Sequence, residues 1–147
     1  MSFEALAARL REQPEVGALD VLPYAAMLGL SYAKAGGELV VTMPYAEGLV
    51  GQPFPPRLHG GTVAGLMEIT ATAALVVALL GDEVVPTLKP VNVTVDYLRA
   101  GAPQDTFAAA HINRLGRRIA NLRVEAWQDD RALPIAGAHM NILLARG

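Results

Sequence analysis

The sequence predicts one α+β domain over residues 1–147, in which a single antiparallel sheet curls around one long apolar helix. Two observations support this prediction. Residues 57–81, "RLHGGTVAGLMEITATAALVVALLG", form the most hydrophobic segment of the chain, and after His59 they carry one ionisable side chain, Glu68. Runs that alternate between apolar and polar residues lie on both sides of this segment, as expected of half-buried antiparallel strands.

The first part of the chain predicts a helix, a short turn or helix, and two strands. Residues 3–12 place apolar side chains at helical spacing, with Ser2 able to cap the helix and Pro14 ending it. A short turn or helix is expected over residues 19–29. Two extended runs then flank the Ala-Gly-Gly sequence at residues 35–37, which is a hairpin signal.

The middle of the chain predicts a loop and the central helix. Residues 46–57, "AEGLVGQPFPPR", contain three prolines and two glycines, so no regular structure is expected there. The helix follows from about Thr62 to Leu80 and is apolar nearly all round, so protein should cover most of it. Its length would also suit a membrane span. A carboxylate at mid-membrane would cost several kcal/mol, so we predict a buried core helix and no membrane.

The last part of the chain predicts four strands. The run "PVNVTVDYL" alternates valines with polar side chains. Polar turns separate the four predicted strands from one another. One sheet of six strands must therefore curl to bury the single helix. The long, regular "PVNVTVDYL" run predicts a sheet edge to which a symmetric partner could add its own strand. The four runs cover residues 90–98, 106–114, 118–128 and 133–145.

The composition excludes several classes of function. The net charge of −2 offers no basic surface for nucleic acid. The absence of cysteine removes disulfides and thiolate catalysis, and the only serines, Ser2 and Ser31, lie outside any nucleophile elbow. The three histidines, His59, His111 and His139, lack metal-ligand spacing, and no glycine pattern for a nucleotide cofactor is present. We expect no metal and no cofactor, and the start of the chain suggests a cytoplasmic protein.

The entrance to the central helix has two interpretations. The first N–H groups of a helix lack intrahelical partners, and glycines there let other groups come close to the backbone. Gly60 and Gly61 could therefore form an oxyanion hole, with Glu68 as a carboxylate about two turns further along. The same residues are equally consistent with a tight turn into a helix and a glutamate at an exposed gap.

Several segments together resemble the hotdog-fold acyl-CoA thioesterases of the phenylacetic-acid-degradation type. The segment "LVGQPFPPRLHGGTVAGLMEITATAAL" is similar to the core motif of that family: a G-N/Q-P loop, then H-G-G, then an acidic residue seven positions after the second glycine. "VLPYAAMLGL", "VNVTVDYLRAG" and "GRRIANLRVEAWQDDRALPIAGAHMNI" resemble its other segments. The resemblance covers most of the chain and implies a hotdog fold that hydrolyses a small aromatic or a short- to medium-chain acyl-CoA.

The resemblance also implies catalytic roles. Glu68 would act as a nucleophile or as a general base on water, and the Gly60 N–H would donate to the thioester oxygen. Gln52, in the loop before the helix, would orient the water or the carboxylate. Thr72, one turn after Glu68, would help to hold the water, although a back-bond to its own helix is the simpler explanation. His59, at the entrance where substrate would bind, is expected to brace the loop rather than to transfer protons.

Further residues are expected to bind coenzyme A. Gly61 lies at the same helix entrance as Gly60, where the acyl group would enter. Three arginines, Arg114, Arg117 and Arg118, cluster in the turn "NRLGRR" and are candidates for the phosphates. A solvated hairpin tip explains them equally well, and Arg99 is a weaker candidate.

The resemblance implies a homodimer or a dimer of dimers, with each active site between two subunits. Two other functions stay open. A hotdog protein of this sequence could bind acyl-CoA without hydrolysing it, as a sensor or scaffold. A hotdog 3-hydroxyacyl dehydratase is disfavoured, because such an enzyme needs a histidine in the loop that here reads "GQPFPP".

Overall fold

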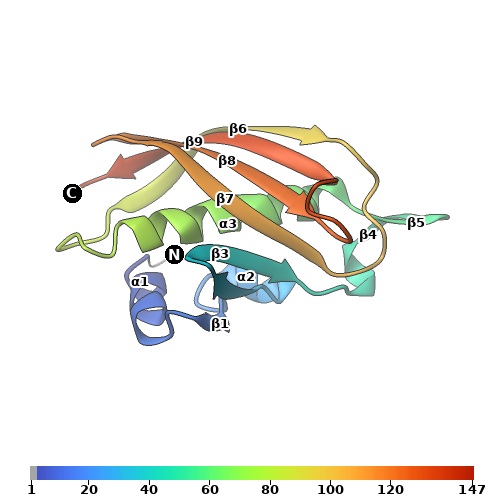
Figure 1. Cartoon of the computed structure of the whole chain (residues 1–147), viewed down its shortest axis with the longest axis horizontal. Coiled ribbons are helices and arrows are strands. Elements are labelled where there is room, and N and C mark those ends of the chain that lie inside the picture. The colour runs from blue at the N-terminus through green and yellow to red at the C-terminus, as the bar shows by residue number, and fades with distance from the viewer. Residues whose placement is uncertain (1–2) are drawn as a thin grey trace.

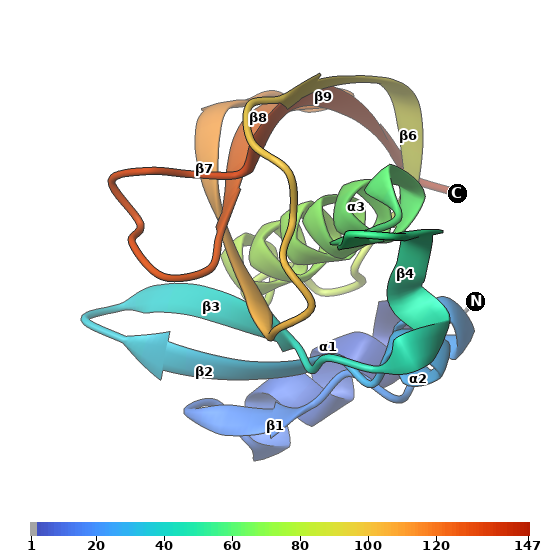
Figure 2. The same ribbon diagram turned by 90° about the vertical axis from the view of Figure 1, so that its right-hand side faces the viewer.

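The computed structural model describes residues 3–147 as one antiparallel sheet curled around a central helix (Figures 1 and 2). This arrangement confirms the predicted α+β class. The described sheet has the strand order β1-β2-β3-β7-β8-β9-β6, and all neighbouring strands are antiparallel. The strands are β1 (Val16–Ala18), β2 (Ser31–Ala35), β3 (Glu38–Met43), β6 (Thr87–Tyr97), β7 (Thr106–Leu115), β8 (Ile119–Trp127) and β9 (Ala136–Ala145).

The central helix α3 spans Gly60–Ala78 and begins two residues before the predicted start at Thr62. Strands β6–β9 arch over one side of α3, while β1–β3, α1 (Phe3–Glu12) and α2 (Pro23–Leu28) lie on the other (Figure 2). By length and composition α3 could cross a membrane, but it is the core helix of this fold, with most of its apolar side chains buried. The predicted Ser2 cap of α1 lies outside the described residues.

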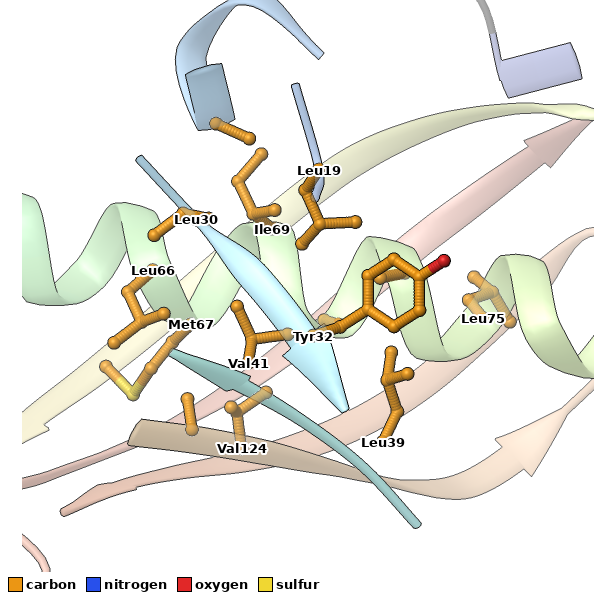
Figure 3. Close-up of a cluster of buried hydrophobic side chains, with 14 of the residues drawn as sticks. Leu19, Leu30, Tyr32, Leu39, Val41, Leu66, Met67, Ile69, Leu75 and Val124 are labelled. Carbon is orange, nitrogen blue, oxygen red and sulfur yellow. The ribbon is translucent and has the colours of Figure 1, made fainter. Parts of the chain in front are cut away.

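The apolar core fills the space between α3 and the strands on both sides of it (Figure 3). Tyr32 of β2 is the largest of its fully buried side chains. Its hydroxyl donates to the Gln13 carbonyl at 2.6 Å, so this polar atom has a partner inside the protein. Burial raises the pKa of the Tyr32 hydroxyl, because the charged form would lose its hydration.

Two expectations for the chain before α3 were wrong. The first strand, β1, was not predicted, because three residues are too few to show an alternating pattern. It pairs with β2, so the sheet has seven described strands rather than six. Residues 46–57 were expected to lack regular structure, yet they contain the 3₁₀ turn η1 (Glu47–Leu49), β4 (Val50–Pro53) and β5 (Pro56–Leu58). The prolines are tolerated because β4 and β5 form a separate two-stranded ribbon that pairs Pro53 with Pro56 at its tip.

Strand β6 forms an edge of the sheet, as its sequence predicted. One face of β6 was expected to be buried, but Val91 and Val93 are 61% and 38% exposed. The reason is that α3 packs chiefly against β7 and makes few contacts with β6. The apolar face of β6 therefore stays open beside the helix.

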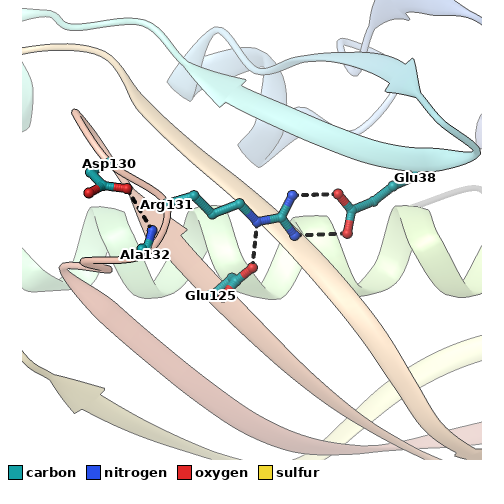
Figure 4. Close-up of polar contacts among 5 residues, drawn as sticks. All are labelled: Glu38, Glu125, Asp130, Arg131 and Ala132. Atoms are coloured by element: carbon teal, nitrogen blue, oxygen red, sulfur yellow. Dashed lines mark hydrogen bonds and ion pairs between the residues drawn. The ribbon is translucent and has the colours of Figure 1, made fainter.

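The connection between β8 and β9 is held by a cluster of charges around Arg131 (Figure 4). Its guanidinium donates to both carboxylate oxygens of Glu38, at 2.5 and 2.8 Å, and to Glu125 at 2.6 Å. It also lies over the Trp127 ring, 4.5 Å from the centroid. The hydrogen bond from Arg131 holds the pKa of Glu38 below its usual value. This Arg131 clamp ties the β8–β9 connection to the start of β3.

Candidate active site

The first turn of α3 is capped by the side chain that precedes it. His59 is the N-cap residue, and its Nδ1 accepts a hydrogen bond from the Gly61 N–H at 2.9 Å. The Thr62 hydroxyl donates to the His59 carbonyl at 2.7 Å. Gly51 of β4 lies against His59, where a Cβ would come within 2.9 Å of the His59 Cα. The histidine therefore braces the helix entrance, which is the structural role expected of it.

The His59 cap leaves only one of the two glycine N–H groups free to bind a ligand. Because the Gly61 N–H is bound to His59, the expected pair of oxyanion donors is reduced to Gly60. Among residues 3–147, no acceptor contacts the Gly60 N–H. This group points out of the first turn with the positive end of the helix dipole, so it is suited to bind a developing negative charge.

A cleft of about 360 Å³ opens beside Gly60. Tyr97, the last residue of β6, forms part of it and donates its hydroxyl hydrogen to the Gly60 carbonyl at 2.9 Å. The opposite wall comes from the β8–β9 connection, where the Ile135 carbonyl accepts from the N–H groups of Leu98 and Arg99. The cleft is lined by Leu58, Gly60, Val63, Tyr97, Leu98, Arg99, Ala100, Gly101, Ile135 and Ala136.

Glu68 lies in the middle of α3 and is partly exposed. Positions 61, 65, 68 and 72 fall on one face of a helix, so Glu68 shares a stripe with Gly61 and Thr72. Within the described chain, the Glu68 carboxylate has no ion-pair or hydrogen-bond partner. Partial exposure lets the charged group exist without such a partner, and leaves it free to bind a water molecule.

Thr72 shows the back-bond that was the simpler explanation for it. Its hydroxyl donates to the carbonyl oxygen of Glu68 at 3.0 Å, and the side chain is nearly buried. The hydroxyl proton is therefore used within the helix. Only the lone pairs of the oxygen remain for a water molecule beside Glu68.

Gly60 and Glu68 are too far apart in one chain to act on the same atom. Eight positions separate them on α3, which corresponds to a rise of about 12 Å along the helix axis. A thioester carbonyl needs both an oxyanion donor and a nucleophile at about 3 Å. A single protomer therefore brings only one of the two predicted catalytic groups to any one substrate.

Gln52 lies on the β4–β5 ribbon, which projects beyond the end of the sheet (Figure 1). The side chain is exposed, and its Nε2 donates to the Phe54 carbonyl at 3.3 Å. No hydrogen bond joins Gln52 to Glu68, which lies two turns into the following helix. The neighbouring Phe54 ring is 88% exposed, so the ribbon presents an apolar tip to solvent in the single chain.

The three arginines of the β7–β8 turn lie at the other end of the molecule from Gly60. The Leu144 N–H donates to the Arg118 carbonyl, which places the turn beside the end of β9 and the start of β6 (Figure 1). Arg114, Arg117 and Arg118 line one depression of about 630 Å³. Arg117 and Arg118 line a second of about 720 Å³, together with Arg146. The sequence pattern missed Arg146, because it lies at the far end of the next hairpin strand.

The sequence did not predict Tyr97 as a site residue, and it predicted Arg99 only as a weaker candidate. Tyr97 was counted as one apolar position of an alternating strand, and nothing local distinguishes it from its neighbours. Arg99 was a weaker phosphate candidate, but it lines the cleft beside Gly60 and donates to the Pro134 carbonyl at 2.8 Å. Both depend on contacts between segments far apart in the sequence.

Comparison with known proteins identifies the family. The sequence pattern of the thioesterase superfamily matches residues 56–135, which include β5, α3 and the strands β6 to β8. A solved protein of Chromobacterium violaceum is 35% identical, with 97% of this chain and 98% of that chain covered and a TM-score of 0.72. No match was found among curated proteins.

More distant structures share the fold. A thioesterase family protein of Silicibacter pomeroyi is 20% identical over 97% of this chain and 99% of its own, with a TM-score of 0.73. A phenylacetic acid degradation-related protein of Ralstonia eutropha JMP134 is 20% identical over 95% and 99%, with a TM-score of 0.72. The sequence match covers more than half of the chain, and it includes the whole of α3 with Gly60 and Glu68. This protein is therefore a member of the thioesterase superfamily.

Proposed function

We propose that this protein hydrolyses the thioester of an acyl-CoA, with Glu68 as the catalytic carboxylate and the Gly60 N–H as the oxyanion donor. One observation carries the proposal: the core helix of a thioesterase-superfamily fold holds a carboxylate and an N–H group that both lack partners among the described residues. A carboxylate can activate water or attack a carbonyl, and an N–H at a helix start can bind the resulting oxyanion.

The chemistry needs no other strong acid or base. In the general-base route, Glu68 takes a proton from water as the water oxygen attacks the thioester carbon, and the carbonyl oxygen becomes an oxyanion held by Gly60. Collapse of this intermediate expels the coenzyme A thiolate, whose conjugate thiol has a pKa near 8.5. In the alternative route, Glu68 attacks the carbon itself and water hydrolyses the resulting anhydride. Neither route requires a metal or a cofactor.

The spacing on α3 supports an active site shared between two chains. Since Gly60 and Glu68 of one chain lie about 12 Å apart along the axis, we propose that Gly60 of one chain acts with Glu68 of its partner. The open edge at β6 supports a homodimer, because Val91 and Val93 are exposed there and a paired edge would cover them. A dimer of dimers could form from two such pairs.

The same symmetry assigns the hairpin arginines to the partner's site. Antiparallel pairing of two β6 strands places the end of one beside the start of the other. Tyr97 and Gly60 lie at the end of β6, and Arg118 lies near its start. We propose that Arg114, Arg117 and Arg118 bind the coenzyme A phosphates of the site that contains the partner's Gly60.

The remaining predicted residues have supporting roles in this proposal. Gln52, on the projecting ribbon, orients water or carboxylate in a neighbouring chain. Thr72 accepts a hydrogen bond from the attacking water through its oxygen lone pairs, while Gly61 and the His59 cap form the entrance for the acyl group. The cleft beside Gly60, which Leu58, Val63 and Leu98 line in part, suits a small aromatic or a short- to medium-chain acyl group. Such a protein would act in the cytoplasm.

The test is the Glu68→Gln variant, which keeps the side-chain size and removes the charge. We expect kcat to fall at least ~100-fold, with the fold intact and KM nearly unchanged. A panel of benzoyl-, phenylacetyl-, butyryl- and octanoyl-CoA would be assayed with a thiol reagent, which detects only coenzyme A because the chain has no cysteine. Glu47→Gln, at an exposed carboxylate of η1, is the matched control and should leave kcat unchanged.

The outcomes separate the competing functions. Near-wild-type turnover by Glu68→Gln would remove Glu68 from the mechanism. Tight binding of the acyl-CoA panel by the wild-type protein without thiol release would favour a non-catalytic acyl-CoA-binding protein instead. A dehydratase is not supported, because residues 46–58 contain no histidine. Single turnover in ¹⁸O-labelled water tests the nucleophilic route, because label enters Glu68 only when water attacks the Glu68 carbonyl of an anhydride.

A further inference from the structure

Tyr97 joins the end of β6 to the first residue of α3. Its hydroxyl donates to the Gly60 carbonyl at 2.9 Å. Its ring lies so close to Gly60 that a Cβ there would sit 3.0 Å from the ring atoms Cε1 and Cζ. A side chain at position 60 would force the Tyr97 ring to move away by a few tenths of an ångström. One tyrosine thus fixes both the direction of the Gly60 carbonyl and the distance between the helix start and the sheet edge.

The backbone N–H groups around Gly60 are held by other contacts. Leu58 donates to the Gly101 carbonyl at 3.0 Å, and His59 donates to the Leu49 carbonyl at 2.8 Å. Gly61 donates to the His59 ring, as described above. Among the described residues, the Gly60 N–H is the one in this stretch that has no acceptor. A single free donor therefore lies beside the cleft, on a backbone that is anchored on both sides.

We propose that Tyr97 is a positioning residue that fixes the Gly60 Cα and carbonyl, and through the Cα holds the N–H of the preceding peptide plane toward the thioester oxygen. This inference rests on the proposed oxyanion role of Gly60. A carbonyl oxygen has two lone pairs, so Gly60 can accept the tyrosine hydrogen bond as well as its helix bond. Because the hydroxyl proton is used on Gly60, Tyr97 acts through the backbone rather than on the substrate. Its ring also keeps water from the side of Gly60 that it covers.

Preorganisation explains why such a brace matters for the rate. An oxyanion donor lowers the barrier only if it already points to where charge develops, since reorientation during the reaction would cost part of the gain. The first turn of a helix is its most easily frayed part. A brace at Gly60 should therefore affect the transition state more than substrate binding, and so kcat more than KM.

The experiment compares two tyrosine-to-phenylalanine variants whose rings pack against the same helix, α3. Tyr97→Phe keeps the ring against Gly60 and removes only the hydrogen bond. Tyr24→Phe is the matched control, because the Tyr24 ring packs on Gly65 of α3 in the same manner and its hydroxyl has no recorded partner in the described chain. Two readouts are taken: kcat and KM with an acyl-CoA that the wild type hydrolyses, and the ¹H–¹⁵N resonance of the Gly60 amide in the free protein.

We expect Tyr97→Phe to lower kcat roughly tenfold with KM within about twofold, and to shift the Gly60 amide resonance. Tyr24→Phe should change neither. An unchanged kcat and an unmoved Gly60 amide in Tyr97→Phe would overturn the inference, as would an equal loss in both variants. If the wild type hydrolyses no thioester, the proposed function fails. The amide resonance needs no turnover and would still show whether Tyr97 holds Gly60.

Discussion

Single residues at the start of α3 determine which backbone groups a ligand can reach. The His59 cap uses the Gly61 N–H and leaves the Gly60 N–H free. Chemically, the cap needs only a hydrogen-bond acceptor at this position, and a histidine is not among the usual N-cap residues. A substitution that keeps an acceptor but lacks a titratable ring can therefore distinguish a capping role of His59 from a proton-transfer role.

His59→Ala and His59→Asn test this separation. His59→Ala removes the cap and should lower the free energy of unfolding by about 1 kcal/mol, whereas His59→Asn supplies another acceptor and should restore the wild-type value. Urea unfolding followed by circular dichroism measures both at one protein concentration. Thioesterase activity in His59→Asn should remain near wild type. Equal destabilisation by both substitutions would contradict the cap, and loss of activity in a stable His59→Asn would assign the ring a chemical role.

Some of the candidate site residues could be predicted from the sequence, and others could not. Glu68 and Gly60 could be found because a lone charge in an apolar run and a glycine pair before it are local patterns. The loss of the Gly61 donor could not be found, because it depends on which way the His59 ring turns. Tyr97 meets Gly60 across 37 positions of sequence, and an alternating strand gives no sign of which residue ends beside a helix.

At the scale of elements, the long periodic segments and the short helix α2 were predicted well, whereas the shortest strands were not. Helices α1 and α3 and the strands β2, β3 and β6–β9 lie near their expected positions. The strands β1, β4 and β5 were missed because each has at most four residues, and proline-rich sequence is typical of loops. Of these strands, the β4–β5 ribbon bears most on the proposed function, since it carries Gln52 and leads directly into the helix start.

The Arg131 clamp is an element-scale device whose strength depends on pH. The pKa of Glu38 is lowered in the folded state, so its contribution is complete above the unfolded pKa of about 4.3 and is lost as pH falls through the lower folded value. Glu38→Gln should lower stability by up to about 1 kcal/mol at pH 7, since the pair is partly exposed. The difference from wild type should shrink toward zero in acid.

Thermal unfolding from pH 7 to pH 3 measures this difference. Glu83→Gln is the control, because Glu83 is an exposed carboxylate without an ion pair in the described chain, and it should match the wild type throughout. If Glu38→Gln remains less stable than the wild type by the same amount down to pH 3, the charge of Glu38 is not the cause of the difference. No deficit at pH 7 would show that the ion pair contributes nothing to stability.

At the scale of the whole molecule, three features of a single chain support the proposed dimer. The two catalytic candidates on α3 are about 12 Å apart along the axis, β6 is an unpaired edge, and the Phe54 ring is exposed on a projecting ribbon. A two-fold axis at β6 would resolve all three features together. The sequence indicated such pairing from the regular "PVNVTVDYL" edge, but the separation of Gly60 and Glu68 becomes an argument only once both lie on one straight helix.

The shared site predicts that two inactive chains restore each other. Gly60→Pro removes the oxyanion N–H at the first helical position, where proline suits the backbone and requires only a small shift of the Tyr97 ring, and Glu68→Gln removes the carboxylate. Each variant alone should be dimeric by light scattering and nearly inactive. After unfolding and refolding as an equal mixture, half of the dimers should be mixed, and each mixed dimer should contain one complete site. The expected activity is therefore roughly a quarter of wild type, and a mixture as inactive as its components, or a wild-type protein active as a strict monomer, would place the whole site within one chain.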